Sequence, residues 1–176
     1  MTPQEFIQLK AFARQDGALL SLLWIGSFIC YIKGMSIPLL GMLSLLLAIM
    51  SPFYVASRLR HFRDAARDGI ISFRRGYAYT ALTYFYGGLL LAVAIFVYFA
   101  FLDNGYLMSI LSEVLNSEQG RQLVKLYGMG NEMEQGLRTL GEMRPIDFAL
   151  NMLTVNISFG FILGLPTAAL MQRAGK

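Results

Sequence analysis

Charged residues are scarce in this 176-residue chain, where aspartate, glutamate, lysine and arginine together make up only 15%. Soluble domains usually carry about a quarter of charged residues, because their surface faces water. Hydrophobic residues make up 56%, and the mean hydropathy is +0.52. The shortage of charge therefore argues against an ordinary soluble domain and predicts long apolar runs instead.

Cysteine, histidine and the sequence signatures of enzymes are equally scarce. Cys30 is the only cysteine, so an internal disulfide is excluded, and the CxxC and C…H spacings of metal sites do not occur. We expect Cys30 to be a buried apolar residue. His61, the only histidine, stands among arginines and is a poor catalytic candidate. No H-E-x-x-H, G-x-S-x-G, P-loop or G-x-G-x-x-G motif is present. We therefore expect no catalytic residue, no metal and no cofactor.

Four apolar runs dominate the chain, at residues 17–32, 37–56, 77–102 and 146–171. A helix needs about 20 residues to cross the hydrocarbon core of a bilayer, and the last three runs reach that length. The first run is shorter. A cleaved signal peptide is the alternative there, but no A-x-A-like site follows it and the second run starts at once. The sequence predicts an all-α membrane bundle of four transmembrane helices, forming a single domain over residues 1–176.

Lysines and arginines are unevenly divided between the two sides that four spans define. Ten of the fifteen lie in the N-terminal tail, the middle loop (residues 57–76) and the C-terminal tail, which contains Arg173 and Lys176. Since basic loops stay inside, both termini are predicted to be cytoplasmic, in a bacterial inner membrane. The loop of residues 103–144 then faces outward, and its six acidic residues make it net acidic.

This outer loop contains a helical pattern from about Tyr106 to Leu126, interrupted at Gly120. We expect an amphipathic extracytoplasmic helix on the membrane surface, with Met108 and Tyr127 toward lipid or the bundle. Residues 128–141 are rich in glycine, glutamate and asparagine and should be the most mobile part of the chain.

The middle loop carries the strongest local signal, six arginines beside the inner leaflet. They are Arg58, Arg60, Arg63, Arg67, Arg74 and Arg75. Each basic group near an anionic membrane surface contributes about 1 kcal/mol, and the guanidinium fork suits phosphate. These residues are candidates for binding lipid headgroups, a phosphorylated substrate or an acidic partner. The alternative is that they only fix the orientation of the chain.

The fourth apolar run is the most polar of the four. Asn151, Thr154 and Ser158 share one helical face, and Asp147 lies at its outer end. Polar groups in hydrocarbon need a partner or a wet cavity, so this face predicts either a small polar path or hydrogen bonds between helices. Asn156 points elsewhere and needs a partner of its own.

Glycines in the third and fourth runs predict where these two helices meet. Gly160 and Gly164 form a G-x-x-x-G pattern that lets another backbone approach, and Gly87 and Gly88 lie at a comparable depth in the third run. A homodimer seam through Gly160 and Gly164 is the alternative.

The stretch Gly69-Ile70-Ile71-Ser72-Phe73-Arg74-Arg75-Gly76 leads into the third run, after a short helical hairpin and a charged segment. An acidic outer loop follows, and the closing run starts after Pro145. The chain thereby resembles the DUF4199 family, small four-span membrane proteins of unknown function found mainly in Bacteroidota. The resemblance implies topology and origin, and it supplies no mechanism or catalytic residue.

The leading hypothesis is a non-enzymatic accessory or scaffold protein of the inner membrane that binds anionic lipid or a membrane partner through its arginine-rich loop. A lipid or small-solute carrier using the polar face of the fourth span is one alternative. A membrane enzyme acting on a phosphorylated lipid is another. The expected partners are membrane lipids, with a second copy or another membrane protein as alternatives, and no nucleic acid.

Overall fold

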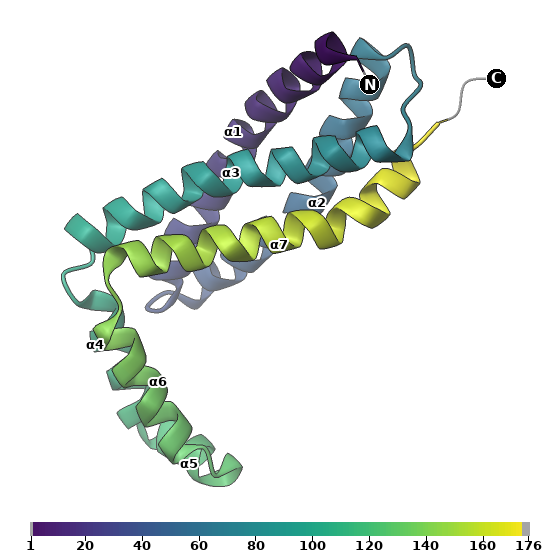
Figure 1. The fold of residues 1–176 in the computed structure, drawn as a ribbon. Helices are drawn as coiled ribbons and strands as arrows, with labels where there is room; N and C mark the ends of the chain where they lie inside the picture. The colour runs from purple at the N-terminus through teal and green to yellow at the C-terminus, as the bar shows by residue number, and fades with distance from the viewer. Residues whose placement is uncertain (1, 174–176) are drawn as a thin grey trace. The chain divides into compact units, whose positions relative to one another are not determined.

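The computed structural model describes residues 2–173, and this part of the chain forms seven helices (Figure 1). They are α1 (Pro3–Gly34), α2 (Pro38–Ala66), α3 (Phe73–Phe101), α4 (Tyr106–Asn116), α5 (Glu118–Tyr127), α6 (Gly130–Glu142) and α7 (Pro145–Met171). Four of them, α1, α2, α3 and α7, are long and apolar enough to cross a membrane. The predicted all-α bundle with four spans is therefore confirmed. Lys176, which counted toward the predicted orientation, lies outside the described residues.

The first helix begins well before the apolar run that predicted it. Thr2 and Glu5 form a capping box, in which the Thr2 hydroxyl accepts from the Glu5 N–H at 3.3 Å and the Glu5 carboxylate accepts from the Thr2 N–H at 2.8 Å. A helix of 32 residues is about 48 Å long, against about 30 Å of hydrocarbon. The first turns of α1 therefore extend beyond the membrane-spanning part, and α2 likewise continues past residue 56 to Ala66.

The chain divides into two compact units. The first (Met1–Ala94 with Leu150–Lys176) contains α1, α2, most of α3 and most of α7. The second (Ile95–Ala149) contains the end of α3, the three helices α4, α5 and α6, and the start of α7.

In the first unit, α1 and α2 form a tight hairpin. A side chain on Gly34 would meet the Gly41 Cα at 2.5 Å, so the two helices meet closely where the hairpin turns. Further along, the Ser27 hydroxyl donates to the Ser44 carbonyl at 2.9 Å. Many large apolar side chains on these helices remain exposed, including Leu39 and Phe53. Such an outer surface fits lipid, because hydrocarbon covers it as well as protein does.

A core cluster of buried residues lies where α1, α2 and α3 meet: Leu9, Ala13, Leu59, Phe62, Ile71 and Tyr79. The Phe62 and Tyr79 rings stack at 5.0 Å. Beside them the α2–α3 connection turns through Asp68 and Gly69, both with positive φ. It then exchanges two backbone hydrogen bonds between Ile71 and Arg173, at 3.0 and 3.2 Å. This connection is thus fixed to the segment that follows α7.

The second unit corrects one expectation about the outer loop and adds a helix to a segment for which none was predicted. The predicted break at Gly120 is wrong, because the helix ends at Asn116 and Ser117 caps α5 by accepting from the Gly120 N–H at 3.0 Å. Gly120 is still needed at this turn, since a Cβ there would lie 2.1 Å from a carbonyl of α4. Residues 128–141, for which composition predicted mobility, are mostly helix α6. Met133, Leu137 and Leu140 give that helix one apolar face, which its glycines and acids obscured.

Candidate functional site

A carboxylate is buried in the first unit at the junction of three helices. Asp16 of α1 is 1% exposed. Its Oδ1 atom accepts from the Arg58 Nε of α2 at 2.6 Å, and its Oδ2 atom accepts from the Tyr79 hydroxyl of α3. Burying a charge is costly unless it is paired and hydrogen-bonded, and here both carboxylate oxygens have a partner. Asp16 therefore ties α1, α2 and α3 together.

Glycine explains how α3 comes close enough for this contact. A Cβ on Gly17 would lie 2.8 Å from the Thr83 carbonyl and from the Tyr86 Cβ, and one on Gly87 would lie 3.1 Å from the Gly17 carbonyl. The backbones of α1 and α3 therefore touch directly after Asp16. Tyr79 lies one turn before Thr83, whose hydroxyl donates to the Tyr79 carbonyl at 2.9 Å. This close approach places the Tyr79 ring beside the carboxylate.

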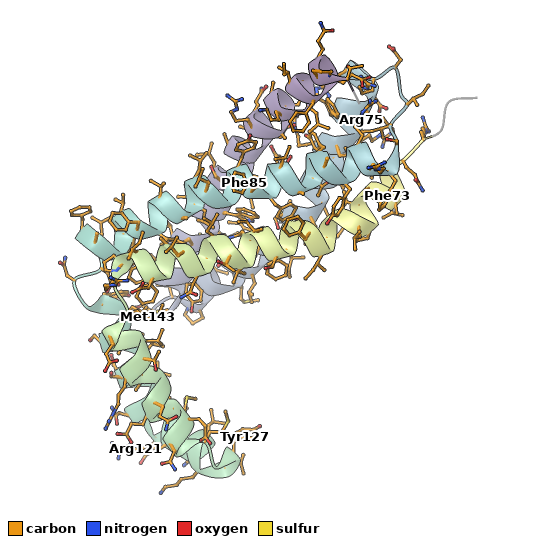
Figure 2. The ribbon with its side chains drawn as sticks, in the orientation of Figure 1. Phe73, Arg75, Phe85, Arg121, Tyr127 and Met143 are labelled. Atoms are coloured by element: carbon orange, nitrogen blue, oxygen red, sulfur yellow. The ribbon has the colours of Figure 1, made fainter. Side chains whose placement is uncertain are left out.

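A second acid joins two arginines of the predicted basic site. The Glu5 Oε1 atom accepts from Arg67 at 2.7 Å, and its Oε2 atom accepts from Arg75 at 2.7 Å. Arg75 is labelled near the start of α3 in Figure 2. Glu5 thereby connects the start of α1 to the residue that follows α2 and to the first turns of α3. Both arginines are largely covered, so these contacts are more than loose surface pairs.

The Arg63 side chain also makes its hydrogen bonds inside the protein. Its side chain is buried, its Nε donates to Asp64 at 2.7 Å, and its Nη1 donates to the Met171 carbonyl at 3.2 Å. The last carbonyls of a helix lack partners within that helix, and a cation there complements the helix dipole. Arg63 therefore stabilises the end of α7 against α2.

Only Arg60 and Arg74 remain directed to the outside. The Arg60 side chain is 70% exposed and reaches Asp64 only at 3.7 Å. Arg74 is exposed and makes no ion pair within residues 2–173. The six predicted arginines therefore separate into an internal set of four (Arg58, Arg63, Arg67 and Arg75) and an external pair. That any of them binds lipid or a partner stays a prediction.

The predicted polar face of α7 lies on the outer surface of the first unit. Asn151, Thr154 and Ser158 are all exposed. The Thr154 hydroxyl donates to the Leu150 carbonyl and the Ser158 hydroxyl to the Thr154 carbonyl, both at 2.9 Å, so these bonds stay within the helix. Asn156 is instead buried, and it donates to the Met152 carbonyl at 2.8 Å.

Asp147 belongs to the second unit, where it caps the start of α7. It accepts from the Arg144 backbone N–H at 2.9 Å, and from its Nε and Nη2 at 3.0 Å each. The carboxylate raises the pKa of the Arg144 guanidinium above its ordinary value. The acid at the start of the last span is thus part of a local helix cap.

The predicted glycines lie where helices approach each other. A Cβ on Gly160 would lie 2.6 Å from the Tyr84 Cβ, one on Gly164 would lie 3.1 Å from the Tyr77 ring, and one on Gly88 would lie 3.0 Å from the Asn156 Cβ. These three glycines therefore bring α3 and α7 together. Gly87 instead faces α1, as described above.

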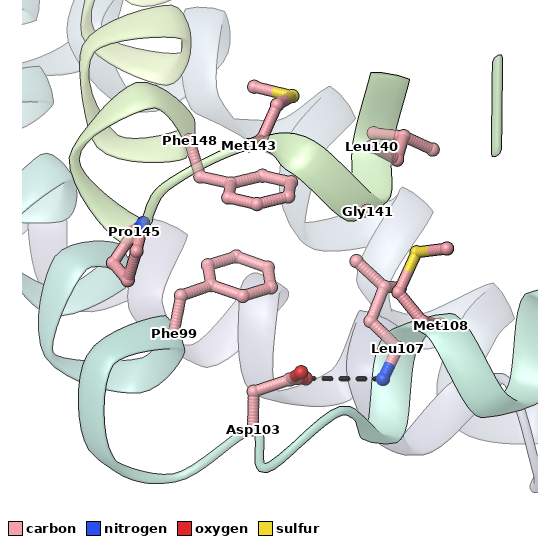
Figure 3. A pocket seen from close by; sticks show the side chains of 9 residues that line it. All are labelled: Phe99, Asp103, Leu107, Met108, Leu140, Gly141, Met143, Pro145 and Phe148. Atoms are coloured by element: carbon pink, nitrogen blue, oxygen red, sulfur yellow. Dashed lines mark hydrogen bonds between the residues drawn. The ribbon is translucent and has the colours of Figure 1, made fainter. Parts of the chain in front are cut away.

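The second unit contains a pocket of about 160 Å³ (Figure 3). Its lining consists of Phe99, Asp103, Leu107, Met108, Leu140, Gly141, Met143, Pro145 and Phe148. The Phe99 and Phe148 rings stack at 4.1 Å. Asp103 is the one acid in the lining, and it accepts from the Gly105 and Leu107 backbone N–H groups at 3.1 and 3.2 Å. This carboxylate caps α4, and it is the one charged side chain in the lining. Within the described residues, no group of acids, cysteines or histidine could hold a metal ion.

Sequence reasoning missed the two acids that organise the first unit. Asp16 lies directly before the first apolar run and was left outside the predicted span. Glu5 belongs to the sequence T-P-Q-E, whose capping-box spacing announces a helix that starts at Pro3. Had that helix been predicted, Asp16 would have been recognised as an acid in mid-helix, beside an apolar face.

A family model described as "Protein of unknown function (DUF4199)" matches residues 15–173. No curated protein and no solved structure matches the chain.

Proposed function

We propose that this chain, which belongs to the DUF4199 family, is a non-enzymatic accessory protein of the bacterial inner membrane that binds anionic lipid headgroups through Arg60 and Arg74. The observation that carries the proposal is the division of the arginines. Four are held inside the protein by Asp16, Glu5, Asp64 and a helix end, whereas these two remain available to a ligand.

Location and chemistry support lipid as the ligand. Arg60 lies in the last turns of α2 and Arg74 in the first turn of α3, on either side of the connection between two membrane-spanning helices, so both stay close to a bilayer surface. In the orientation that the distribution of lysine and arginine predicts, that surface is the anionic cytoplasmic leaflet. Each exposed guanidinium can contribute about 1 kcal/mol there, and its planar fork holds a phosphate through two parallel hydrogen bonds.

The two acids on α1 that hold internal arginines, Asp16 and Glu5, support a role without catalysis. A general base needs a lone pair within hydrogen-bond reach of its substrate. Both oxygens of Asp16 are taken by Arg58 and Tyr79, and each oxygen of Glu5 holds an arginine. These carboxylates act as structural anchors, and the proposal assigns them no chemical step.

Native mass spectrometry of the protein extracted from bilayers of phosphatidylglycerol and phosphatidylcholine tests the proposal. The Arg60→Gln/Arg74→Gln variant should retain fewer phosphatidylglycerol molecules than the parent protein, with unchanged retention of the neutral lipid. Arg138→Gln/Arg144→Gln is the matched control, because it removes the same charge from the outer loop.

If both variants lost phosphatidylglycerol equally, net charge alone would explain the binding, and the proposal would fail. If neither variant lost phosphatidylglycerol, the proposal would also be overturned. A protein that co-purifies from native membranes and disappears in the Arg60→Gln/Arg74→Gln variant would replace lipid by a membrane-protein partner.

A further inference from the structure

Helix α5 has an apolar face that nothing in the second unit covers. Leu123, Leu126 and Tyr127 lie at positions i, i+3 and i+4, and Leu126 and Tyr127 are 76% and 69% exposed. None of the residues of α5 is buried. An exposed apolar face on a helix marks a contact surface, whereas single exposed apolar residues do not.

The packing of α5 on its neighbour uses a different side of the helix. Val124 is half-buried, and its Cγ1 atom lies 3.8 Å from the position of a Cβ on Gly130, the first residue of α6. Leu123, Leu126 and Tyr127 therefore form a second apolar surface, separate from the one that joins α5 to α6. We call these three residues the α5 outer face. Figure 2 labels Tyr127 on it, and Arg121 on the same helix.

The connections of the second unit limit what this face can meet. Residues 103–144 leave α3 at one end and enter α7 at the other, and both helices are membrane spans. Two successive spans place the segment between them on one side of a bilayer. The surface of that leaflet is therefore always within reach of α5, at an effective concentration that no dissolved partner matches.

The charges of α5 also fit a phospholipid surface. Besides Glu118, the helix carries Arg121 and Lys125, so it is net basic. The rest of the segment is acidic, with two lysine or arginine residues against five acids outside α5. Arg121 and Lys125, four positions apart, lie on the side of α5 opposite Leu123, Leu126 and Tyr127. They would face water and draw the basic helix toward an anionic surface, while leucines enter the acyl region and a tyrosine lies at headgroup level.

We propose that α5 is a surface anchor, whose outer face inserts into the outer leaflet of the membrane that the chain itself spans. Leu123 and Leu126 contact acyl chains, Tyr127 lies among the headgroups, and Arg121 and Lys125 lie on the opposite, water-facing side of the helix. The ligand is a bilayer surface of phospholipid, and this contact is separate from the cytoplasmic arginine site.

Site-directed spin labelling in vesicles of phosphatidylethanolamine and phosphatidylglycerol tests this inference. Cys30→Ser removes the only cysteine, and Leu126→Cys or Leu123→Cys then places one label on the α5 outer face. Each substitution leaves two of the three anchoring side chains in place. Gln135→Cys is the matched control, because Gln135 is an exposed residue on the polar side of α6.

The label on the α5 outer face should collide with oxygen, which concentrates in lipid, several-fold more often relative to a water-soluble nickel reagent than the control label does. Equal and high nickel accessibility at all three sites would overturn the inference. Protection from both reagents, together with cross-linking between copies through Leu126→Cys, would also overturn it and would identify a second copy of the chain as the occupant.

Discussion

Removing one partner at a time from the Asp16–Arg58 pair should destabilise the protein unequally. Asp16 is 1% exposed, whereas 28% of the Arg58 side chain is exposed. Arg58→Gln leaves a carboxylate that water does not reach, and breaking a buried pair in this way costs about 3–5 kcal/mol. Because Tyr79 still donates to the carboxylate, we expect a loss in the free energy of unfolding of about 3 kcal/mol, at the lower end of that range.

Asp16→Asn should cost less. The guanidinium of Arg58 is partly accessible and can turn toward water or lipid phosphate, while the new amide oxygen can still accept from Tyr79. The expected loss is about 1.5 kcal/mol, which is typical of one hydrogen bond to a charged group. The two single variants should therefore differ by about 1.5 kcal/mol, with Arg58→Gln the less stable.

The double variant Asp16→Asn/Arg58→Gln measures how much the two charges stabilise each other, apart from their contacts with the rest of the protein. With neither charge present, the loss should be smaller than the sum of the single losses by about 1–2 kcal/mol. Reversible unfolding in mixed micelles, followed through the fluorescence of Trp24, the only tryptophan, measures all three variants. Equal losses in the single variants, or additive losses in the double variant, would refute the description of a buried carboxylate that depends on Arg58.

Three further outcomes are expected. Gly160→Ala should lower the free energy of unfolding by about 1–3 kcal/mol, because the new Cβ would lie 2.6 Å from a tyrosine Cβ, whereas Gly26→Ala, which meets nothing within 4 Å, should leave the melting temperature unchanged or raised. Gly120→Ala should open the turn between α4 and α5 and accelerate limited trypsin cleavage there, while Gly136→Ala, which also meets nothing within 4 Å, should not. Glu5→Gln should release two arginines and raise the number of phosphatidylglycerol molecules retained in native mass spectrometry, so a decrease would contradict the division of the arginines.

The membrane-spanning helices could be predicted because each is a long apolar run that can be recognised in the sequence itself. A run such as residues 77–102 is apolar over more than the thickness of the hydrocarbon core, and no tertiary contact is needed to recognise it. The polar extensions of the helices were harder to predict, because their apolar periodicity is short. The helix α6 shows the same limit, since three apolar residues at helical spacing were outweighed by its glycines and acids.

The internal ion pairs could not be predicted from the sequence in any comparable way. Asp16 is separated from Arg58 by 42 positions and from Tyr79 by 63, and its burial follows from the approach of α3 at Gly17. Six arginines in one segment look equivalent in the sequence. Whether each faces an acid, a helix end or the surroundings depends on which side of α2 or α3 it occupies, and on the acids that α1 supplies.

The Arg63–Met171 contact can form only late in synthesis, after the last helix has been made. Arg63 emerges from the ribosome 108 residues before Met171, whose carbonyl it binds, and the Ile71 backbone must likewise wait for Arg173. A nascent chain that has inserted only its first three spans therefore lacks the partner of the Arg63 guanidinium. It also lacks the partner of the Ile71 backbone, at the same end of the bundle. Docking of α7 satisfies the Arg63 guanidinium and the Ile71 backbone together, so this end of the bundle is completed by the last span.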